Sequence, residues 1–221
     1  MAEKETEFLP YKVIYKPGTG FYEEKKSRFI AYVSPASSEE EAVSFIDSIK
    51  KKHYDARHNC PAFIIGTNSQ LTRCSDDGEP SGTAGKPILE VLMGAGITNV
   101  VVVVTRYFGG TLLGTGGLVR AYTQAVQEGL KDAGIATMRY GVEITVSIDY
   151  TDVGRVQYLL GSRGIEIVAS RYTDKVEFDI CIPKEQEASL QKALVEATSA
   201  RAGIEVTGSG YYMDILEKDN K

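Results

Sequence analysis

The sequence predicts an α+β protein with two domains, residues 1–136 and residues 137–221. Residues 100–104 are five consecutive valines, and a run with no polar face is typical of a strand covered on both sides. Beyond residue 137 the pattern runs strand, helix, strand, strand, helix, strand, the order of a ferredoxin-like βαββαβ domain. A chain of 221 residues suggests one or two domains and is long enough to bury a proper core.

The first domain opens with two strands and a helix. Strands are expected at residues 11–15 and 27–33, with the Pro-Gly-Thr-Gly segment 17–20 as the turn between them. Ser37 or Ser38 caps the helix that follows, which has three glutamates in its first turn and three lysines in its last. That order of charge suits the helix dipole at both ends.

The rest of the first domain surrounds the valine run. A strand at residues 61–67 pairs with one at 71–75 through an Asn-Ser turn. A short helix at 87–93 begins at a proline and stops at glycine. A longer helix covers 118–131, and residues 132–137 form the connection to the second domain. That domain contains strands at 142–148, 165–172, 175–182 and 204–212 and helices at 151–163 and 184–200.

Composition narrows the class of function. The net charge of −5 gives no global attraction for nucleic acid or an anionic membrane, so such binding requires a local patch. No apolar run approaches the ~20 residues that cross a bilayer, and no membrane partner is expected. The three cysteines form no C-x-x-C pair, which is typical of a reducing compartment. We therefore expect a cytoplasmic protein.

A glycine-rich loop lies between the valine strand and the long helix. Glycine allows backbone to approach a ligand, and a helix N-terminus carries partial positive charge, so this order favours an anion site. Arg106 ends the strand, and Arg120 lies at the start of the helix. The alternative is that the glycines only permit a tight reversal, while both arginines pair with nearby carboxylates. The glycines of the predicted site are Gly109, Gly110, Gly116 and Gly117.

A second glycine-rich loop, residues 75–87, places Lys86 at another helix start and strengthens the anion hypothesis. Arg57 and His58 extend the predicted anion site, with His58 either an anion ligand or a structural histidine. Tyr107 and Phe108 are expected either to stack on a base or to fill the core beside the glycines. The carboxylates Asp76, Asp77 and Glu79 suit Mg²⁺, although capping and solubilising a turn is the favoured interpretation.

Several catalytic and cofactor motifs are missing. The segment around Gly85 and Lys86 has proline at two positions that a phosphate-binding P-loop requires to be Gly and Ser or Thr. A dinucleotide fingerprint fails at Val119, and there is no G-x-S-x-G nucleophile elbow. His53, His58, Cys60 and Cys74 lack the spacing of a zinc site. We therefore expect no cofactor and assign no catalytic residue.

Three ordered blocks resemble the IMPACT family, most of all its bacterial YigZ-type branch. They are residues 56–66, residues 75–87 and residues 105–122, within a similarity that covers about residues 18–132. The resemblance implies a first domain similar to the α+β fold of a small-subunit ribosomal protein, an elongation factor G domain and the GHMP kinases. It also implies a second domain similar to the last domain of elongation factor G. Fold likeness of this kind is an analogy for function.

The resemblance implies no settled reaction for the bacterial branch. Its eukaryotic relatives restrain a starvation-responsive initiation-factor kinase by competing for its activator, but they carry a different accessory domain, so that partner does not transfer. Two hypotheses follow. The first is a cytosolic regulatory protein that binds RNA or the ribosome, is linked to translation, and meets phosphates with its basic residues. The second is an enzyme acting on a small phosphorylated or carboxylated ligand through its loop carboxylates.

Overall fold

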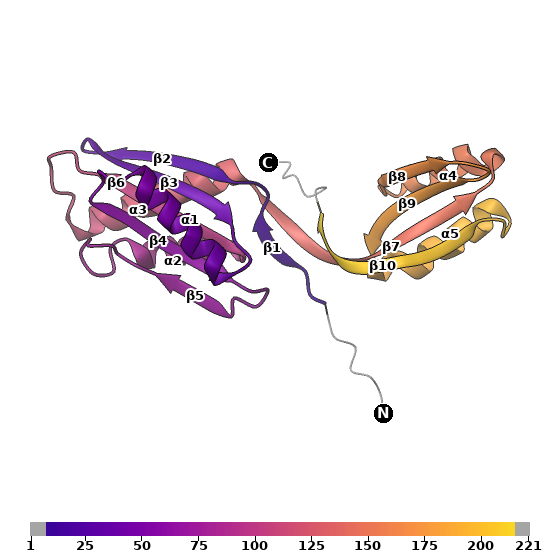
Figure 1. Cartoon of the computed structure of the whole chain (residues 1–221), viewed down its shortest axis with the longest axis horizontal. Coiled ribbons are helices and arrows are strands. Elements are labelled where there is room, and N and C mark those ends of the chain that lie inside the picture. The colour runs from indigo at the N-terminus through magenta and orange to yellow at the C-terminus, as the bar shows by residue number, and fades with distance from the viewer. Residues whose placement is uncertain (1–7, 215–221) are drawn as a thin grey trace, which may run out of the picture. The chain divides into compact units, whose positions relative to one another are not determined.

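The computed structural model describes residues 8–214, which form two compact units. The first unit is Tyr11–Thr137, and the second is Met138–Asp214 together with residues 8–10. Each unit has its own buried apolar core. The mixed α+β class predicted from the sequence is confirmed, and Figure 1 shows a sheet with helices in each unit.

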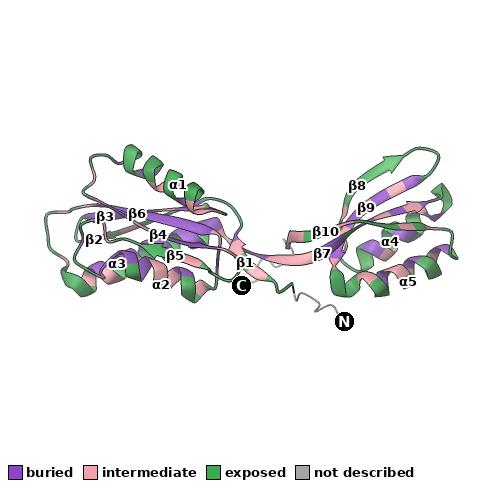
Figure 2. Cartoon of the chain, turned by 60° about the horizontal axis from the view of Figure 1, so that its bottom comes forward, coloured by how far each residue is buried: buried purple, intermediate pink, exposed green. Residues whose placement is uncertain are grey.

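The first unit is a five-stranded antiparallel sheet with helices on both faces. Residues of α1 (Glu39–Lys52) pack on one face, and those of α2 (Gly85–Ala95) and α3 (Gly114–Ala133) pack on the other, as Figure 2 shows. In sheet order the strands are β2 (Gly18–Glu24), β3 (Ser27–Pro35), β6 (Val100–Tyr107), β4 (His58–Ile65) and β5 (Leu71–Cys74).

The central strand β6 confirms the interpretation of the valine run. All five valines are fully buried, with Val102 in the core beneath α2 and α3 and Val101 in the core beneath α1. The helix cap at Ser38 is confirmed as well, because its hydroxyl accepts a hydrogen bond from the backbone N–H of Glu41 at 3.2 Å. The pairing of β4 with β5 is also as predicted.

Three local predictions were wrong. The segment 17–20 is no turn, because β2 begins at Gly18 and pairs with β3 along its whole length. Helix α3 begins at Gly114, four residues before the predicted start, so Gly116 and Gly117 lie inside its first turn. Residues 132–137 are not a connection, because α3 continues to Ala133 and strand β7 starts at Ile135.

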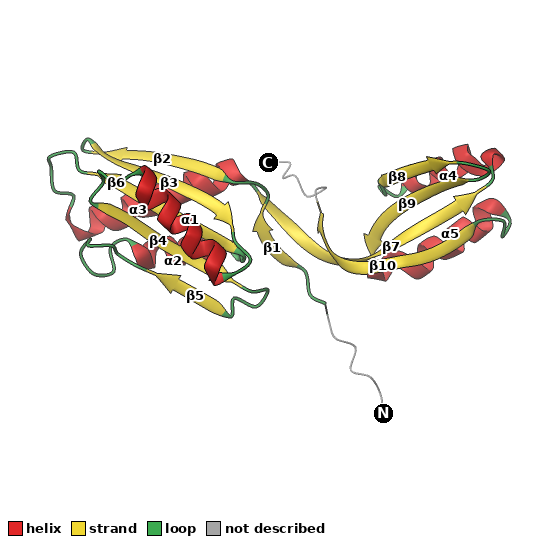
Figure 3. Cartoon of the chain, viewed as in Figure 1, coloured by secondary structure: helices red, strands yellow, loops and turns green. Residues whose placement is uncertain are grey.

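The second unit has the predicted βαββαβ order, and its strands form an antiparallel sheet of the ferredoxin-like kind. Its strand order is β10, β7, β9, β8, and both helices cover one face of that sheet (Figures 2 and 3). The elements are β7 (Ile135–Ile148), α4 (Val153–Ser162), β8 (Ile167–Tyr172), β9 (Val176–Pro183), α5 (Glu187–Thr198) and β10 (Gly203–Asp214). The first unit also contains β1 (Tyr11–Ile14).

An ion pair between a buried carboxylate and an exposed arginine joins the start of α4 to the end of α5 in the second unit. Arg201 lies just after α5, and Asp152 lies immediately before α4 and is buried. Nη2 of Arg201 donates to both carboxylate oxygens of Asp152 at 2.9 Å.

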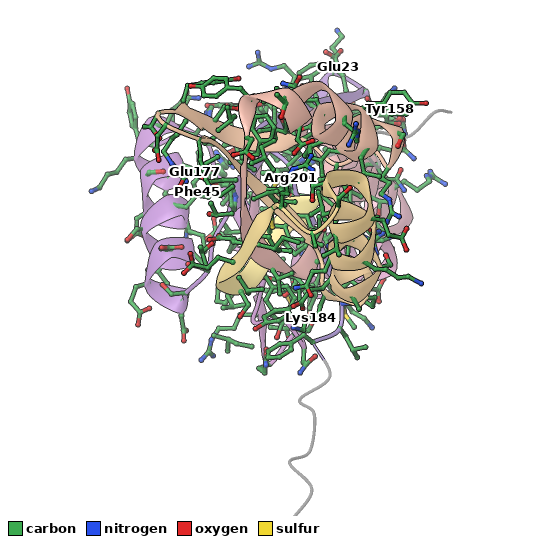
Figure 4. All side chains as sticks on the ribbon, turned by 90° about the vertical axis from the view of Figure 1, so that its right-hand side faces the viewer. Glu23, Phe45, Tyr158, Glu177, Lys184 and Arg201 are labelled. Atoms are coloured by element: carbon green, nitrogen blue, oxygen red, sulfur yellow. The ribbon has the colours of Figure 1, made fainter. Side chains whose placement is uncertain are left out.

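Tyr158 extends outward from α4 on the solvent side, as Figure 4 shows. Among the described helices, none combines the length and apolarity needed to cross a bilayer.

The backbone contact between β2 and α3 generates a stability prediction. A Cβ at Gly20 would lie 2.2 Å from the carbonyl oxygen of Ala125, so Gly20→Ala must push the strand and helix apart. We expect the free energy of unfolding to fall by about 2 kcal/mol or more, measured by urea titration of the first unit's transition. The control Gly94→Ala meets no atom within 4 Å and should stabilise α2 slightly. Equal midpoints for the two variants would contradict this packing.

Candidate functional site

The Arg106 guanidinium is an internal group and not an open anion receptor. Its side chain is 7% exposed, and Nη1 donates to the two carboxylate oxygens of Glu79 at 2.7 and 2.9 Å. The Glu79 carboxylate is itself buried. One guanidinium of the predicted anion site therefore pairs with a carboxylate of the chain, as the alternative interpretation of the arginines had it.

Further polar groups complete a buried cluster around this ion pair. Tyr122 of α3 donates its hydroxyl proton to Glu79 Oε1 at 2.8 Å, and the Cys60 thiol lies 3.3 Å from the Tyr122 oxygen. Burial raises the pKa of Cys60 to about 12, so this thiol stays protonated. Burial likewise raises the pKa of Tyr122. Arg106 Nε is the exception, being buried without a hydrogen-bond partner among the described residues.

The sheet register separates Arg106 from Tyr107. Arg106 lies opposite Phe29 on β3 and His58 on β4, and its neighbour Tyr107 points to the other face because side chains alternate along a strand. On that face the Tyr107 hydroxyl donates to Asp55 at 2.9 Å. The two residues therefore cannot contact one ligand from the same side of the sheet.

Tyr107 belongs to a chain of hydrogen bonds that sequence reasoning missed. Since its own proton goes to Asp55, the Tyr107 oxygen accepts from Nδ1–H of His53, at 2.9 Å, and His53 Nε2 then accepts from Tyr32 at 2.8 Å. Burial lowers the pKa of His53, and the positive charge of the neighbouring Lys52 lowers it further. The ring is therefore neutral near pH 7. The only sequence signal was that His53 follows a lysine-rich helix end.

The start of α2 is already occupied by a carboxylate. Asp76 accepts backbone N–H bonds from Gly82 at 2.7 Å, Ala84 at 3.0 Å and Gly85 at 2.9 Å. Burial acts to raise the pKa of Asp76, but these three donors together hold it below its ordinary value. An external anion would have to displace this side chain, so the Lys86 end of the second loop offers no vacant slot.

The other loop residues also have internal roles. Asp77 accepts from the backbone N–H of Asn59 at 2.7 Å and pairs with Lys50 at 3.1 Å. A ring nitrogen of His58, Nδ1, lies 3.0 Å from the Asp77 carbonyl oxygen. With Asp76 on backbone donors and Glu79 on arginine, no group of three or more His, Cys, Asp or Glu side chains in the described part of the chain is placed to hold a metal ion.

The glycines of the first glycine-rich loop, which follows β6, differ in whether and why the structure requires a glycine. A Cβ at Gly109 would lie 2.1 Å from the carbonyl carbon of Lys26, so Gly109 is required by packing against the β2–β3 turn. Gly110 has φ +88°, which favours glycine in the turn. A Cβ at Gly117 would have one close neighbour, the Leu113 side chain at 3.0 Å. Gly116 has neither a close neighbour nor a positive φ, so packing does not explain it.

Exposed cations gather at one end of the first unit, which we call the basic end: Lys25, Lys26, Arg28, Arg57 and Arg120. Register places Arg28 opposite Tyr107, in the row next to His58, while Arg120 lies on α3, which packs against β2. Figure 1 shows the β2–β3 turn and the loop before α3 at this end of the sheet. Among the described residues none of the five cations forms an ion pair, whereas Lys86 lies 3.8 Å from Glu90.

The buried Arg106–Glu79 pair generates a second prediction. Glu79→Ala leaves a buried guanidinium without its carboxylate, and we expect the free energy of unfolding to fall by about 3–5 kcal/mol. Glu90→Ala breaks an exposed pair on α2 and should change stability by at most about 0.5 kcal/mol. Urea titration of both variants measures the difference. If the two losses are similar, the Glu79 carboxylate is not compensating a buried charge.

Comparison with family models assigns both units. A model described as "Impact N-terminal domain" matches residues 25–130, and one described as a domain of unknown function, DUF1949, matches residues 146–201. A crystal structure of a protein titled only as hypothetical aligns with a TM-score of 0.57 and 35% identity, covering 90% of this chain and 98% of that chain.

Bacterial relatives match over most of their length. The chain is 41% identical over 180 residues to "IMPACT family member YvyE" of Bacillus subtilis, covering 81% of this chain and 83% of the relative. It is 39% identical to "IMPACT family member YigZ" of Escherichia coli, covering 81% and 89%. "Protein IMPACT" of Mus musculus is 34% identical over 117 residues, which is 35% of its length. These similarities, with both domain matches, show that the chain belongs to the IMPACT family.

Proposed function

We propose that this chain is a cytosolic regulatory protein linked to translation, which associates with RNA or the ribosome through its basic end. The observation that carries the proposal is the set of five exposed cations without ion pairs around one end of a sheet. Nucleic acid binding depends on such a local patch when the whole chain is acidic. The nearby carboxylates are Glu23, Glu24 and Asp55, and the last two each accept a hydrogen bond from a tyrosine.

The start of α3 supplies the proposed phosphate contact. Leu113, at the N-cap position, makes no side-chain cap hydrogen bond, and the residues that follow it, Gly114 to Gly116, are exposed. Uncapped N–H groups at a helix start favour a phosphate oxygen. Arg120 lies on the same helix with an exposed side chain. The contrast with α2 supports this assignment, because Asp76 already fills the start of that helix.

The alternative of an enzyme acting on a small phosphorylated or carboxylated ligand requires free loop carboxylates. Asp76, Asp77 and Glu79 each have protein partners, namely backbone N–H groups, a lysine and an arginine. No contact of the described residues favours that alternative over RNA association.

Binding to RNA is expected to weaken steeply with salt and to depend on the basic end. For Arg57→Gln combined with Arg120→Gln, we expect weaker binding to single-stranded RNA and a salt slope smaller by about 0.7 for each phosphate that the chain no longer neutralises. Fluorescence anisotropy between low and physiological salt measures both quantities. The control Arg163→Gln with Lys175→Gln removes two exposed cations of the second unit. Equal slopes for the two double variants would remove the basic end as the binding surface.

A further inference from the structure

Phe108 is an exposed aromatic ring to which none of the contacts described above gives a function. It directly follows β6 and is 55% exposed. The Arg106 guanidinium lies over its ring, with the central carbon 5.7 Å from the ring centroid. Because Arg106 is buried and held by Glu79, it supports Phe108 from the protein side. Arg106 thus contacts one face of the ring, while more than half of the residue remains exposed.

Tyr107, the other aromatic residue that the sequence offered for base stacking, is poorly placed to stack on a base. The central guanidinium carbon of Arg28 lies 5.0 Å from the centroid of the Tyr107 ring. The Tyr107 hydroxyl is hydrogen-bonded to Asp55 and His53. Tyr32 in the same cluster is covered by Lys52 at 4.5 Å. Phe108 also has a cation over one face, but it is exposed, whereas Tyr107 and Tyr32 are half-buried, and no aromatic ring of the described residues stacks on it.

The surroundings of Phe108 supply positive charge and space. The next residue, Gly109, donates its N–H to Ser27 Oγ at 3.0 Å, which fixes this loop against the β2–β3 turn. Lys25 and Lys26 in that turn are exposed and form no ion pair among the described residues. On the other side, a Cβ at Gly110 would meet no atom within 4 Å. A flat ring, bare backbone and two lysines thus lie next to one another.

We propose that Phe108 is a stacking platform for an unpaired base of single-stranded nucleic acid, with phosphates adjacent to that base on the Lys25–Lys26 turn. A base offers a flat π-face to an aromatic ring, and its strand carries phosphates on either side, which match the ring and the two lysines. A duplex hides its base faces, so the site distinguishes single strands from duplexes. The inference rests on the proposed function and deepens it, because it names the form of nucleic acid that the basic end takes.

The test uses a stacking-deficient variant with a matched control. Phe108→Leu removes the ring, and Phe21→Leu removes a ring of nearly equal exposure, 54%, on β2. With a fluorescein-labelled oligoadenylate of about ten nucleotides, we expect Phe108→Leu to weaken binding roughly five- to a hundredfold. Phe21→Leu should remain within about twofold of the unmodified chain. Both variants alter exposed side chains, and matching thermal unfolding curves confirm that they are folded.

A spectroscopic measurement reports stacking directly. The chain has no tryptophan, so Phe108→Trp creates a single emitter at the platform and Phe21→Trp one at the control position. We expect the oligoadenylate to quench emission at position 108 and to leave that at position 21 unchanged, and a duplex of the same length to quench neither.

The outcomes separate the two proposals. If the unmodified chain binds the single strand in a salt-dependent way, yet Phe108→Leu equals Phe21→Leu and position 108 is not quenched, the platform is wrong and the proposed function stands. If the unmodified chain binds neither RNA nor ribosomes at low salt, the proposed function fails, and the platform fails with it. Equal affinity for the duplex would also overturn the platform.

Discussion

The ion pair between Arg106 and Glu79 is the constraint on which the first unit depends. It joins the carboxyl end of the central strand β6 to the second glycine-rich loop, and Tyr122 connects it to α3. Two charges removed from water are stable only when they are paired and hydrogen-bonded. The loop must therefore fold over the strand end, and the start of α2 is organised by Asp76 a few residues earlier in that loop.

Because Arg106 is held by Glu79, we expect a ligand to contact exposed cations instead of the pocket predicted around Arg106. The predicted anion pocket placed both arginines around one ligand, but the structure uses the Arg106 charge internally and leaves Arg120 exposed. The five cations of the basic end, which form no ion pair among the described residues, lie on the β2–β3 turn, in β3, before β4 and on α3. Arg106 then has a second effect, since its buried guanidinium supports the ring of Phe108. Arg106, which does not face the ligand in our proposal, therefore still shapes the surface at the basic end through its contact with Phe108.

Sequence patterns predicted those features that local periodicity determines. The valine run, the Ser38 cap and the βαββαβ order depend on residues close in sequence, and each was confirmed. Strand β2 was missed because its glycines resemble a turn, whereas the close backbone of α3 is what requires Gly20.

The candidate site was harder to predict, because its partners are far apart in the chain. Glu79 and Arg106 are separated by 27 residues, and no local pattern distinguishes a carboxylate that binds metal from one that neutralises an arginine. The glycines were equally ambiguous. Gly109 packs against the β2–β3 turn, whereas Gly116 has no such neighbour, and only three-dimensional contacts separate the two cases. The register that puts Tyr107 and Arg106 on opposite faces follows from strand alternation and was available from sequence.

The central claim is that Arg106 serves the fold while the exposed cations serve the ligand. The most direct test replaces the ion pair by apolar residues, Glu79→Leu with Arg106→Met, which keeps the net charge and avoids an unpaired buried charge. In this folded double variant, our account predicts an unchanged salt slope for binding of single-stranded RNA, because the slope counts neutralised phosphates and Arg106 neutralises none. A slope reduced as much as in the Arg57 and Arg120 double variant would contradict it and return Arg106 to the binding site.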